Sequence, residues 1–250
     1  MEEQEIWVKS SMDGSMQPSL FYRYPSEGKR PLLVGLHTWS HDRRNQIGNM
    51  LPYAKKHGFH LLLPEFRGEN LSSNPNCQKA CGSEYAKRDI YDAILYAIEQ
   101  GGVDEKNIFL LGCSGGGHMS LLMAGQYPKL FKAVGAFVPI TDLRKWAEQN
   151  KNYASHVLAC CGEGEELERR SPMSYLTGIA QANLKIFHGK FDSVVPVSHS
   201  IELYTAVLTL APRARVYLDI FDGGHEIDME QAFHWILSQY SKKEITKVTG

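Results

Sequence analysis

The chain has 250 residues, of which 43% are hydrophobic and 22% are charged, and its formal net charge is -1. This composition is typical of a globular protein with one sizeable core, so we expect a single domain over residues 1–250. A nearly neutral chain without blocks of like charge argues against nucleic acid or an anionic membrane as a partner. No apolar run approaches the roughly 20 residues that span a bilayer.

Two features bear on the cellular compartment. Residues 1–7 are acidic and lack the basic and apolar regions of a signal peptide, which predicts a cytoplasmic protein. The five cysteines are Cys77, Cys81, Cys113, Cys160 and Cys161. An odd count argues against a complete disulfide framework, so reduced thiols are expected. Cys77 and Cys81 lie four positions apart in a polar loop, but a second ligand pair at short spacing is missing, so no metal site is predicted.

Strands and helices alternate along the chain. The expected strands cover residues 6–10, 20–24, 32–37, 59–64, 108–111, 132–139, 184–189 and 214–221. The expected helices cover residues 45–57, 83–100, 115–126, 198–210 and 228–241. The first two strands are joined by a short turn and predict a hairpin, whereas the later strands are apolar throughout, as in strands buried on both faces. This order predicts a mostly parallel central sheet with helices on both faces.

Residues 32–37 end at a turn that begins with His37, Thr38 and Trp39. A strand end beside a nucleophile commonly supplies one backbone N–H to an oxyanion hole. Trp39 N–H is the candidate donor here, with Thr38 N–H as the alternative. His37 is interpreted as a side chain that hydrogen-bonds the loop backbone rather than one that reacts.

A long polar loop follows the strand at 59–64 and runs to Gly82. Loops of this length without regular structure tend to be functional or mobile. Arg67 is the cation near its start, and it is expected to brace the loop by pairing with Glu65 or Glu69. The alternative is that Arg67 contacts an anionic group of a substrate.

The apolar run 108–111 leads into Gly112-Cys113-Ser114-Gly115-Gly116, followed by small and apolar residues at helical spacing. Strand, Gly-x-Ser-x-Gly turn and helix together indicate a nucleophile elbow, which lifts a serine hydroxyl clear of the sheet. Gly115 N–H at the helix start is the first expected oxyanion donor. Cys113 is expected to point into the sheet as a small apolar filler.

Residues 141–180 interrupt the strand rhythm with short helical segments, which predicts a small cap over the carboxyl ends of the strands. Asp142 at its start is interpreted as a helix N-cap. Trp146 and Tyr153 in this cap, together with Trp39, are candidates for a substrate pocket that stacks on planar groups. The alternative is that these rings seal the cap onto the core.

Ser114, Asp192 and His225 each follow a predicted strand, and they occur in the chain order of a hydrolase triad. His225 is expected to act as general base and acid, while Asp192 orients its ring and Ser114 forms an acyl intermediate. Asp222 is interpreted as part of the turn that carries His225, and His118 as a core residue. This chemistry requires no cofactor.

These residues carry a resemblance to the prolyl-oligopeptidase-like branch of the α/β-hydrolase superfamily. The shared motifs are Arg67-Gly68, Cys81-Gly82-Ser83, Asp89, Gly112–Gly116, Ser171-Pro172, His188–Asp192, Val195-Pro196 and Gly224-His225. The resemblance implies an α/β-hydrolase fold with a small helical cap. A propeller domain like that of the oligopeptidases has no room in 250 residues, which favours the standalone esterases of the branch. Thr38 departs from the glycine that many relatives carry after the histidine.

The expected function is therefore a serine carboxylesterase acting on a small-molecule or carbohydrate ester, such as an acetyl or feruloyl group on a plant polysaccharide. The alternative is a small-peptide serine peptidase of the same branch. A third hypothesis is a hydrolase-fold binding module without activity. The acyl and alcohol preferences and the oligomeric state are not readable from the sequence.

Overall fold

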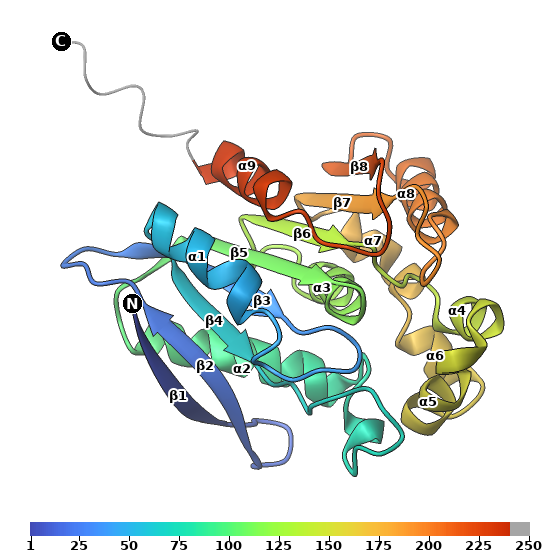
Figure 1. Cartoon of the computed structure of the whole chain (residues 1–250), viewed down its shortest axis with the longest axis horizontal. Coiled ribbons are helices and arrows are strands. Elements are labelled where there is room, and N and C mark those ends of the chain that lie inside the picture. Colours follow the sequence, from blue (N-terminus) through green and yellow to red (C-terminus); the bar gives the residue numbers. More distant parts are fainter. Residues whose placement is uncertain (241–250) are drawn as a thin grey trace.

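The computed structural model describes residues 1–240 and contains an eight-stranded sheet in the order β1-β2-β4-β3-β5-β6-β7-β8 (Figure 1). The strands are β1 (Glu2–Lys9), β2 (Met16–Arg23), β3 (Arg30–Leu36), β4 (His60–Pro64), β5 (Val103–Cys113), β6 (Ala133–Phe137), β7 (Leu184–Gly189) and β8 (Val216–Phe221). The β1–β2 and β2–β4 pairs are antiparallel, and every later pair is parallel. The expected fold class, a mostly parallel sheet with helices on both faces, is confirmed.

Helices cover both faces of this sheet because its strands send alternate side chains to opposite sides. Leu32 and Val34 of β3 join the apolar cluster under α2, α3 and α8, whereas Leu33 joins the cluster under α1 and α9. These helices are α1 (Ile47–His57), α2 (Glu84–Glu99), α3 (Gly115–Gln126), α8 (Ser198–Leu210) and α9 (Met229–Tyr240). The predicted end of the last helix at Ser241 lies outside the described residues.

The ends of the elements follow the local sequence. The Ser83 hydroxyl caps α2 by accepting a hydrogen bond from Ala86 N–H, and α1 ends at Gly58 in a left-handed conformation with φ 75°. The strand β5 starts five residues before the expected run, because Val103 already pairs with Arg30 of β3, ahead of the polar residues 104–107. Hydrophobic periodicity misses such an exposed extension.

Residues 141–180 form short helices, of which those up to residue 169 lie beyond the arrowheads of β5 and β6 (Figure 1), whereas those over residues 172–179 pack against α3 on one face of the sheet. They are α4 (Leu143–Gln149), α5 (Lys151–Cys161), α6 (Glu165–Arg169), η2 (Pro172–Tyr175) and α7 (Leu176–Ile179). The Asp142 carboxylate accepts a hydrogen bond from Lys145 N–H at 3.0 Å and so caps α4 as predicted. The part up to residue 169 lies at the edge of the sheet where the triad candidates emerge. No helix within residues 1–240 is both long and apolar enough to cross a membrane.

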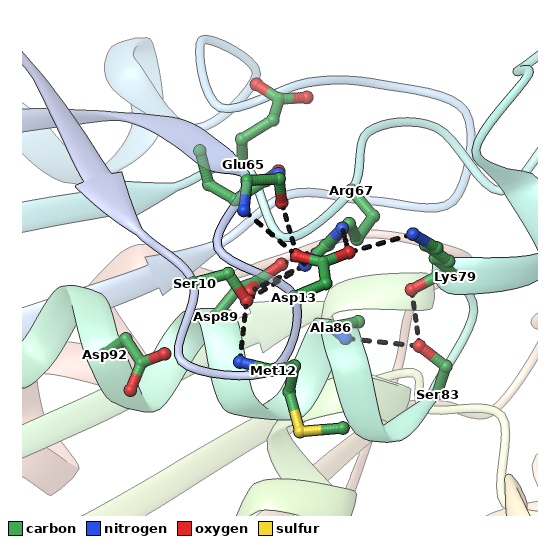
Figure 2. A network of polar contacts seen from close by, with 12 residues as sticks. Ser10, Met12, Asp13, Glu65, Arg67, Lys79, Ser83, Ala86, Asp89 and Asp92 are labelled. Carbon is green, nitrogen blue, oxygen red and sulfur yellow. Dashed lines mark hydrogen bonds and ion pairs between the residues drawn. The ribbon is translucent and has the colours of Figure 1, made fainter.

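A buried ion network fastens the N-terminal hairpin and the long loop to α2 (Figure 2). Arg67 donates to Asp89 on α2 at 2.5 Å and to Asp13 of the hairpin at 2.9 Å. The prediction that Arg67 braces its loop through Glu65 or Glu69 is wrong in its partners. Glu65 instead binds Arg43 at 2.7 Å. Glu65 and Glu69 are close to Arg67 in the sequence, but the fold places Asp89 of α2 and Asp13 of the hairpin against its guanidinium group.

Candidate active site

The Ser114 turn has the strained backbone of a nucleophile elbow. Ser114 lies between β5 and α3 with φ 56° and ψ -117°, a conformation that L-residues rarely adopt. A Cβ on Gly112 would lie 2.1 Å from the carbonyl oxygen of Gly116, so only glycine allows the helix to start this close to the strand. The Ser114 N–H donates to Phe137 O on β6 at 2.9 Å and holds the turn against the sheet.

Asp192 and His225 are in direct contact. His225 Nδ1 lies 2.7 Å from Asp192 Oδ2, while Asp192 Oδ1 accepts the N–H groups of Val194 and Val195 at 2.8 and 2.9 Å. Burial alone would raise the pKa of Asp192, but hydrogen bonds from His188, His225 and the Val195 N–H lower it well below the usual range. The carboxylate is therefore ionised and accepts the Nδ1 proton, which leaves His225 Nε2 as the basic nitrogen.

The three triad candidates emerge at one edge of the sheet. Ser114, Asp192 and His225 directly follow the carboxyl ends of β5, β7 and β8 or the turns after them. These strands run parallel in one sheet, so their carboxyl ends lie at the same edge. Burial, with a smaller contribution from the Asp192 carboxylate, raises the pKa of the Cys113 thiol to about 12. Among residues 1–240, no hydrogen bond joins Ser114 Oγ to His225. The structure thus brings two of the three side chains into contact, and nucleophile contacts are often long without substrate.

The backbone of Trp39 lies against the elbow. A Cβ on Gly115 would sit 2.6 Å from Trp39 N, which places this N–H beside the start of α3. The alternative donor, Thr38 N–H, is already bound to Asn45 Oδ1 at 3.1 Å. Trp39 N–H has no acceptor among the described residues. Of the two N–H groups weighed from the sequence, only that of Trp39 is available.

His37 acts on the loop backbone, in line with its interpretation from the sequence. Its Nε2 lies 2.7 Å from Glu65 O, and its ring stacks on Phe66 with centroids 3.9 Å apart. These contacts join the β3 turn to the start of the long loop. They leave the ring engaged with the backbone and not with the elbow.

The three aromatic candidates for substrate binding form a sealed cluster. Trp39 and Trp146 are only 2% and 1% exposed, and their rings meet edge to face at 4.8 Å. Tyr153, which is half-buried, packs on Trp146 at 4.7 Å. The two indole faces that the pocket prediction required are thus covered, because the cap helices close over them. The arrangement corresponds to the alternative in which the rings seal the cap onto the core.

This cluster also holds the Asp192 loop, a link that the sequence did not indicate. Trp146 Nε1 donates to Val194 O at 2.9 Å, and Asn150 donates to the same oxygen at 3.1 Å. His188, which is fully buried, places Nε2 2.8 Å from Val195 O and 3.4 Å from Asp192 Oδ2. In the sequence, only the spacing of four residues between His188 and Asp192 points to this contact.

The remaining polar candidates have structural contacts. His118 is fully buried and donates from Nε2 to Arg170 O at 2.7 Å, which matches its interpretation as a core residue. Asp222 is exposed on the turn before His225. Within residues 1–240, no group of three or more His, Cys, Asp and Glu side chains is arranged to hold a metal ion.

Residues 47–241 match the family described as the prolyl oligopeptidase family. The chain belongs to this family. The match spans well over half of the sequence and confirms the resemblance drawn from the motifs.

The relatives of this family member include several acylaminoacyl peptidases. Acylamino-acid-releasing enzyme 2 of Oryza sativa subsp. japonica is 23% identical over 88% of this chain and 31% of its own length. The acylamino-acid-releasing enzyme of Mus musculus is 25% identical over 77% of this chain and 28% of its own length. The solved Pyrococcus horikoshii acylaminoacyl peptidase superposes with a TM-score of 0.79 at 20% identity, over 98% of this chain and 42% of that chain.

The chain thus spans about a third of the length of these curated relatives. One of the relatives is named as inactive. Inactive dipeptidyl peptidase 10 of Mus musculus is 28% identical over 49% of this chain and 15% of its own length.

Proposed function

We propose that this member of the prolyl oligopeptidase family is a serine hydrolase that cleaves small peptides. Ser114 is the nucleophile, His225 the general base and acid, and Asp192 the residue that orients the imidazole. The observation that carries this proposal is the 2.7 Å contact from His225 Nδ1 to Asp192 Oδ2, at the same sheet edge as the strained Ser114 elbow. A hydroxyl needs such a base because it is a poor nucleophile on its own.

The mechanism follows from the proton positions. Because Nδ1–H is held by the Asp192 carboxylate, Nε2 takes the Ser114 proton as the hydroxyl attacks the carbonyl carbon. The N–H groups of Gly115 and Trp39 face the oxygen that becomes negative, and each such donor stabilises the transition state by about 3 kcal/mol. The imidazolium then protonates the leaving amine. Water attacks the acyl-Ser114 intermediate by the same route in reverse and restores the enzyme.

The substrate class proposed is a peptide or amino-acid amide with an acylated N-terminus. Its support is that the relatives described above are named for releasing acylated amino acids. This reverses the order expected from the sequence, in which a carboxylesterase acting on a small-molecule or carbohydrate ester came first and a peptidase second. That order depended on the length of the chain, and the comparisons favour the peptidase. An activated ester remains a substrate for the same nucleophile, so only amide cleavage separates the two hypotheses.

Turnover on four substrates tests the proposal: acetyl-alanine p-nitroanilide, alanine p-nitroanilide, methyl ferulate and p-nitrophenyl acetate. We expect cleavage of the acetylated anilide, at least tenfold slower cleavage of the free-amine anilide, and no cleavage of methyl ferulate. Ser114→Ala should lower kcat by about 10⁴-fold or more while circular dichroism stays unchanged. Rapid methyl ferulate cleavage with inert anilides would restore the esterase hypothesis. Turnover retained in Ser114→Ala would remove the nucleophile.

A matched pair of carboxylate variants tests the role of Asp192. Asp192→Asn keeps the shape of the side chain but favours the wrong imidazole tautomer, so kcat should fall by about 10⁴-fold. Asp222→Asn, on the exposed turn next to His225, should keep activity within a few-fold of wild type. Equal losses in the two variants would show that the loop and not the Asp192 contact controls activity.

A further inference from the structure

A second histidine lies against the Asp192 carboxylate. His188 is the penultimate residue of β7, and its side chain is fully buried. Both ring nitrogens have a polar partner, since Nδ1 lies 2.7 Å from Ser200 Oγ on α8 and Nε2 lies 2.8 Å from Val195 O. The Nε2 atom also lies 3.4 Å from Asp192 Oδ2. The ring therefore bridges helix α8 and the loop that carries the triad carboxylate.

The neighbours of His188 Nε2 decide where this ring carries its proton. Val195 O is a carbonyl oxygen that can only accept a hydrogen bond, and the ionised Asp192 carboxylate can only accept as well. A proton on Nε2 satisfies both oxygens. Without it, a nitrogen lone pair would face two acceptors in a site that is closed to solvent. His188 Nε2 is therefore a donor, and the Ser200 hydroxyl meets the ring at Nδ1.

Four N–H groups converge on the two carboxylate oxygens of Asp192. Oδ1 accepts from the backbone of Val194 and Val195. Oδ2 lies between two imidazole rings, with His225 Nδ1 at 2.7 Å and His188 Nε2 at 3.4 Å. The side chain of Asp192 has no exposed surface, so these groups take the place of water around its charge. Burial raises the pKa of Asp192, and the contact with His188 is foremost among those that lower it.

We propose that His188 is a positioning residue for the reaction, which holds the Asp192 carboxylate in place and offsets part of its charge opposite His225. The inference rests on the proposed function, because it concerns the same triad. No hydrogen bond within residues 1–240 joins His188 to Ser114, so its effect reaches the nucleophile through Asp192 and His225.

One N–H group of His188 has two effects on the carboxylate. Its hydrogen bond to Val195 O fixes the peptide segment whose N–H groups bind Asp192 Oδ1. Its proton also faces Asp192 Oδ2, the oxygen that accepts the Nδ1 proton of His225. A carboxylate whose charge is partly offset attracts the imidazolium less strongly. Loss of this N–H should therefore favour protonated His225 and move the acid limb of the activity profile to higher pH.

Other titratable groups lie near this pair of residues. They are Cys113 on β5, His199 on α8, and the exposed Asp222 and Glu226 on the turn that carries His225. Burial raises the pKa of Cys113 to about 12 and lowers the pKa of His199 to about 4, so both side chains are neutral near pH 7. The two exposed carboxylates are the same in every variant described below. A difference in pH dependence between the wild-type protein and a His188 variant therefore reports the change in that ring.

The rate at which a fluorophosphonate labels Ser114, measured across pH, tests this role without a peptide substrate. His188→Leu should lower the labelling rate by about 10- to 100-fold and move its acid limb up by about half a pH unit or more. On acetyl-alanine p-nitroanilide, the same variant should lower kcat and keep KM within about twofold, because the ring lies behind the carboxylate and away from substrate. His188→Gln, whose amide keeps an N–H donor on the side chain, should recover most of the rate and the wild-type acid limb.

A neighbouring buried histidine provides the matched control. His199 is as fully buried as His188 and lies beside Ser200 on α8, but its ring contacts Thr141 and Gln149. His199→Gln should keep the labelling rate within a few-fold of wild type and leave the acid limb unmoved. Ser200→Ala removes only the hydroxyl at Nδ1 of His188, and it should lower the rate a few-fold with an acid limb that moves in the same direction. This milder variant carries the test if circular dichroism shows that His188→Leu does not fold.

The outcomes separate this role from the proposed substrate. An acid limb that stays in place in both His188→Leu and Ser200→Ala, or an equal shift in His199→Gln, would overturn the role of His188. Wild-type protein that is labelled at Ser114 but does not cleave the anilide would overturn the peptidase proposal alone. Wild-type protein that is not labelled at all would remove the nucleophile, and the role of His188 with it.

Discussion

His118 stands one helical turn behind Ser114 and shows what burial does to a single titratable residue. It is fully buried, its Nδ1 has no hydrogen-bond partner among the described residues, and its Nε2 donates to Arg170 O. Burial lowers the pKa of His118 from 6.5 to about 4, and burial lowers the pKa of His199 to about 4 as well. Both rings are therefore neutral in the folded protein at neutral pH.

The protein should lose stability as the pH falls from about 6.5 to about 4. In this window the unfolded chain binds protons on these two histidines and the folded chain does not, so acid favours unfolding. A shift of this size corresponds to about 3 kcal/mol for His118. Urea titrations at several pH values should show a smaller loss in His118→Gln, and His199→Gln should behave similarly. An unchanged loss in both variants would contradict the assignment.

Among the elements, the hairpin β1–β2 and helix α2 are joined through one arginine. Arg67 and Asp89 are both nearly fully buried, and the Asp13 carboxylate of the hairpin completes the network. Burial outweighs the guanidinium at Asp89 and raises its pKa, whereas hydrogen bonds from Arg67 and Lys79 hold the pKa of Asp13 well below its usual range. The contact therefore couples three segments through charges that depend on one another.

Arg67→Met should destabilise the protein by about 3 to 5 kcal/mol, because it leaves the Asp89 carboxylate buried without a partner. The double variant Arg67→Met with Asp89→Leu should recover most of this loss. Arg88→Met is the matched control on α2, since the pair of Arg88 with Asp92 at 3.0 Å is partly exposed and should contribute less than about 1 kcal/mol. Urea denaturation measures all three. No recovery in the double variant would contradict the ion-pair argument.

For the described molecule as a whole, two apolar layers share one sheet. Phe109 and Leu110 are consecutive in β5 and fully buried, yet they belong to the clusters on opposite faces. Each central strand contributes side chains to both layers, so disrupting the packing of one layer also destabilises the other. We therefore expect the chain to unfold as one cooperative unit.

Phe109→Ala should cost about 3 to 5 kcal/mol and Leu110→Ala about 2 to 5 kcal/mol. Both variants should shift the same single transition, followed by tryptophan fluorescence and by circular dichroism. Leu210→Ala, at a side chain that is 55% exposed, should change stability by less than about 0.5 kcal/mol. Separate transitions for the two layers would show that the sheet does not unite them.

Local patterns in the sequence determined much of this architecture. Apolar runs and helical spacing predicted the order of strands and helices, and the Gly-x-Ser-x-Gly turn located the Ser114 elbow. Ser114, Asp192 and His225 were each predicted to follow a strand, in the chain order of a triad. The structure shows Asp192 hydrogen-bonded to His225. These features were readable because each depends on residues close together in the chain or on the shared edge of parallel strands.

Contacts between distant segments were decided only by the tertiary structure. They include the partners of Arg67, the availability of Trp39 N–H and the burial of the two indoles. The contact of Cys81 with Cys161 belongs to the same class, because the two cysteines lie 80 positions apart in the chain. Side-chain pairing and burial depend on which surfaces the packed elements present to one another, and periodicity along the chain does not encode that.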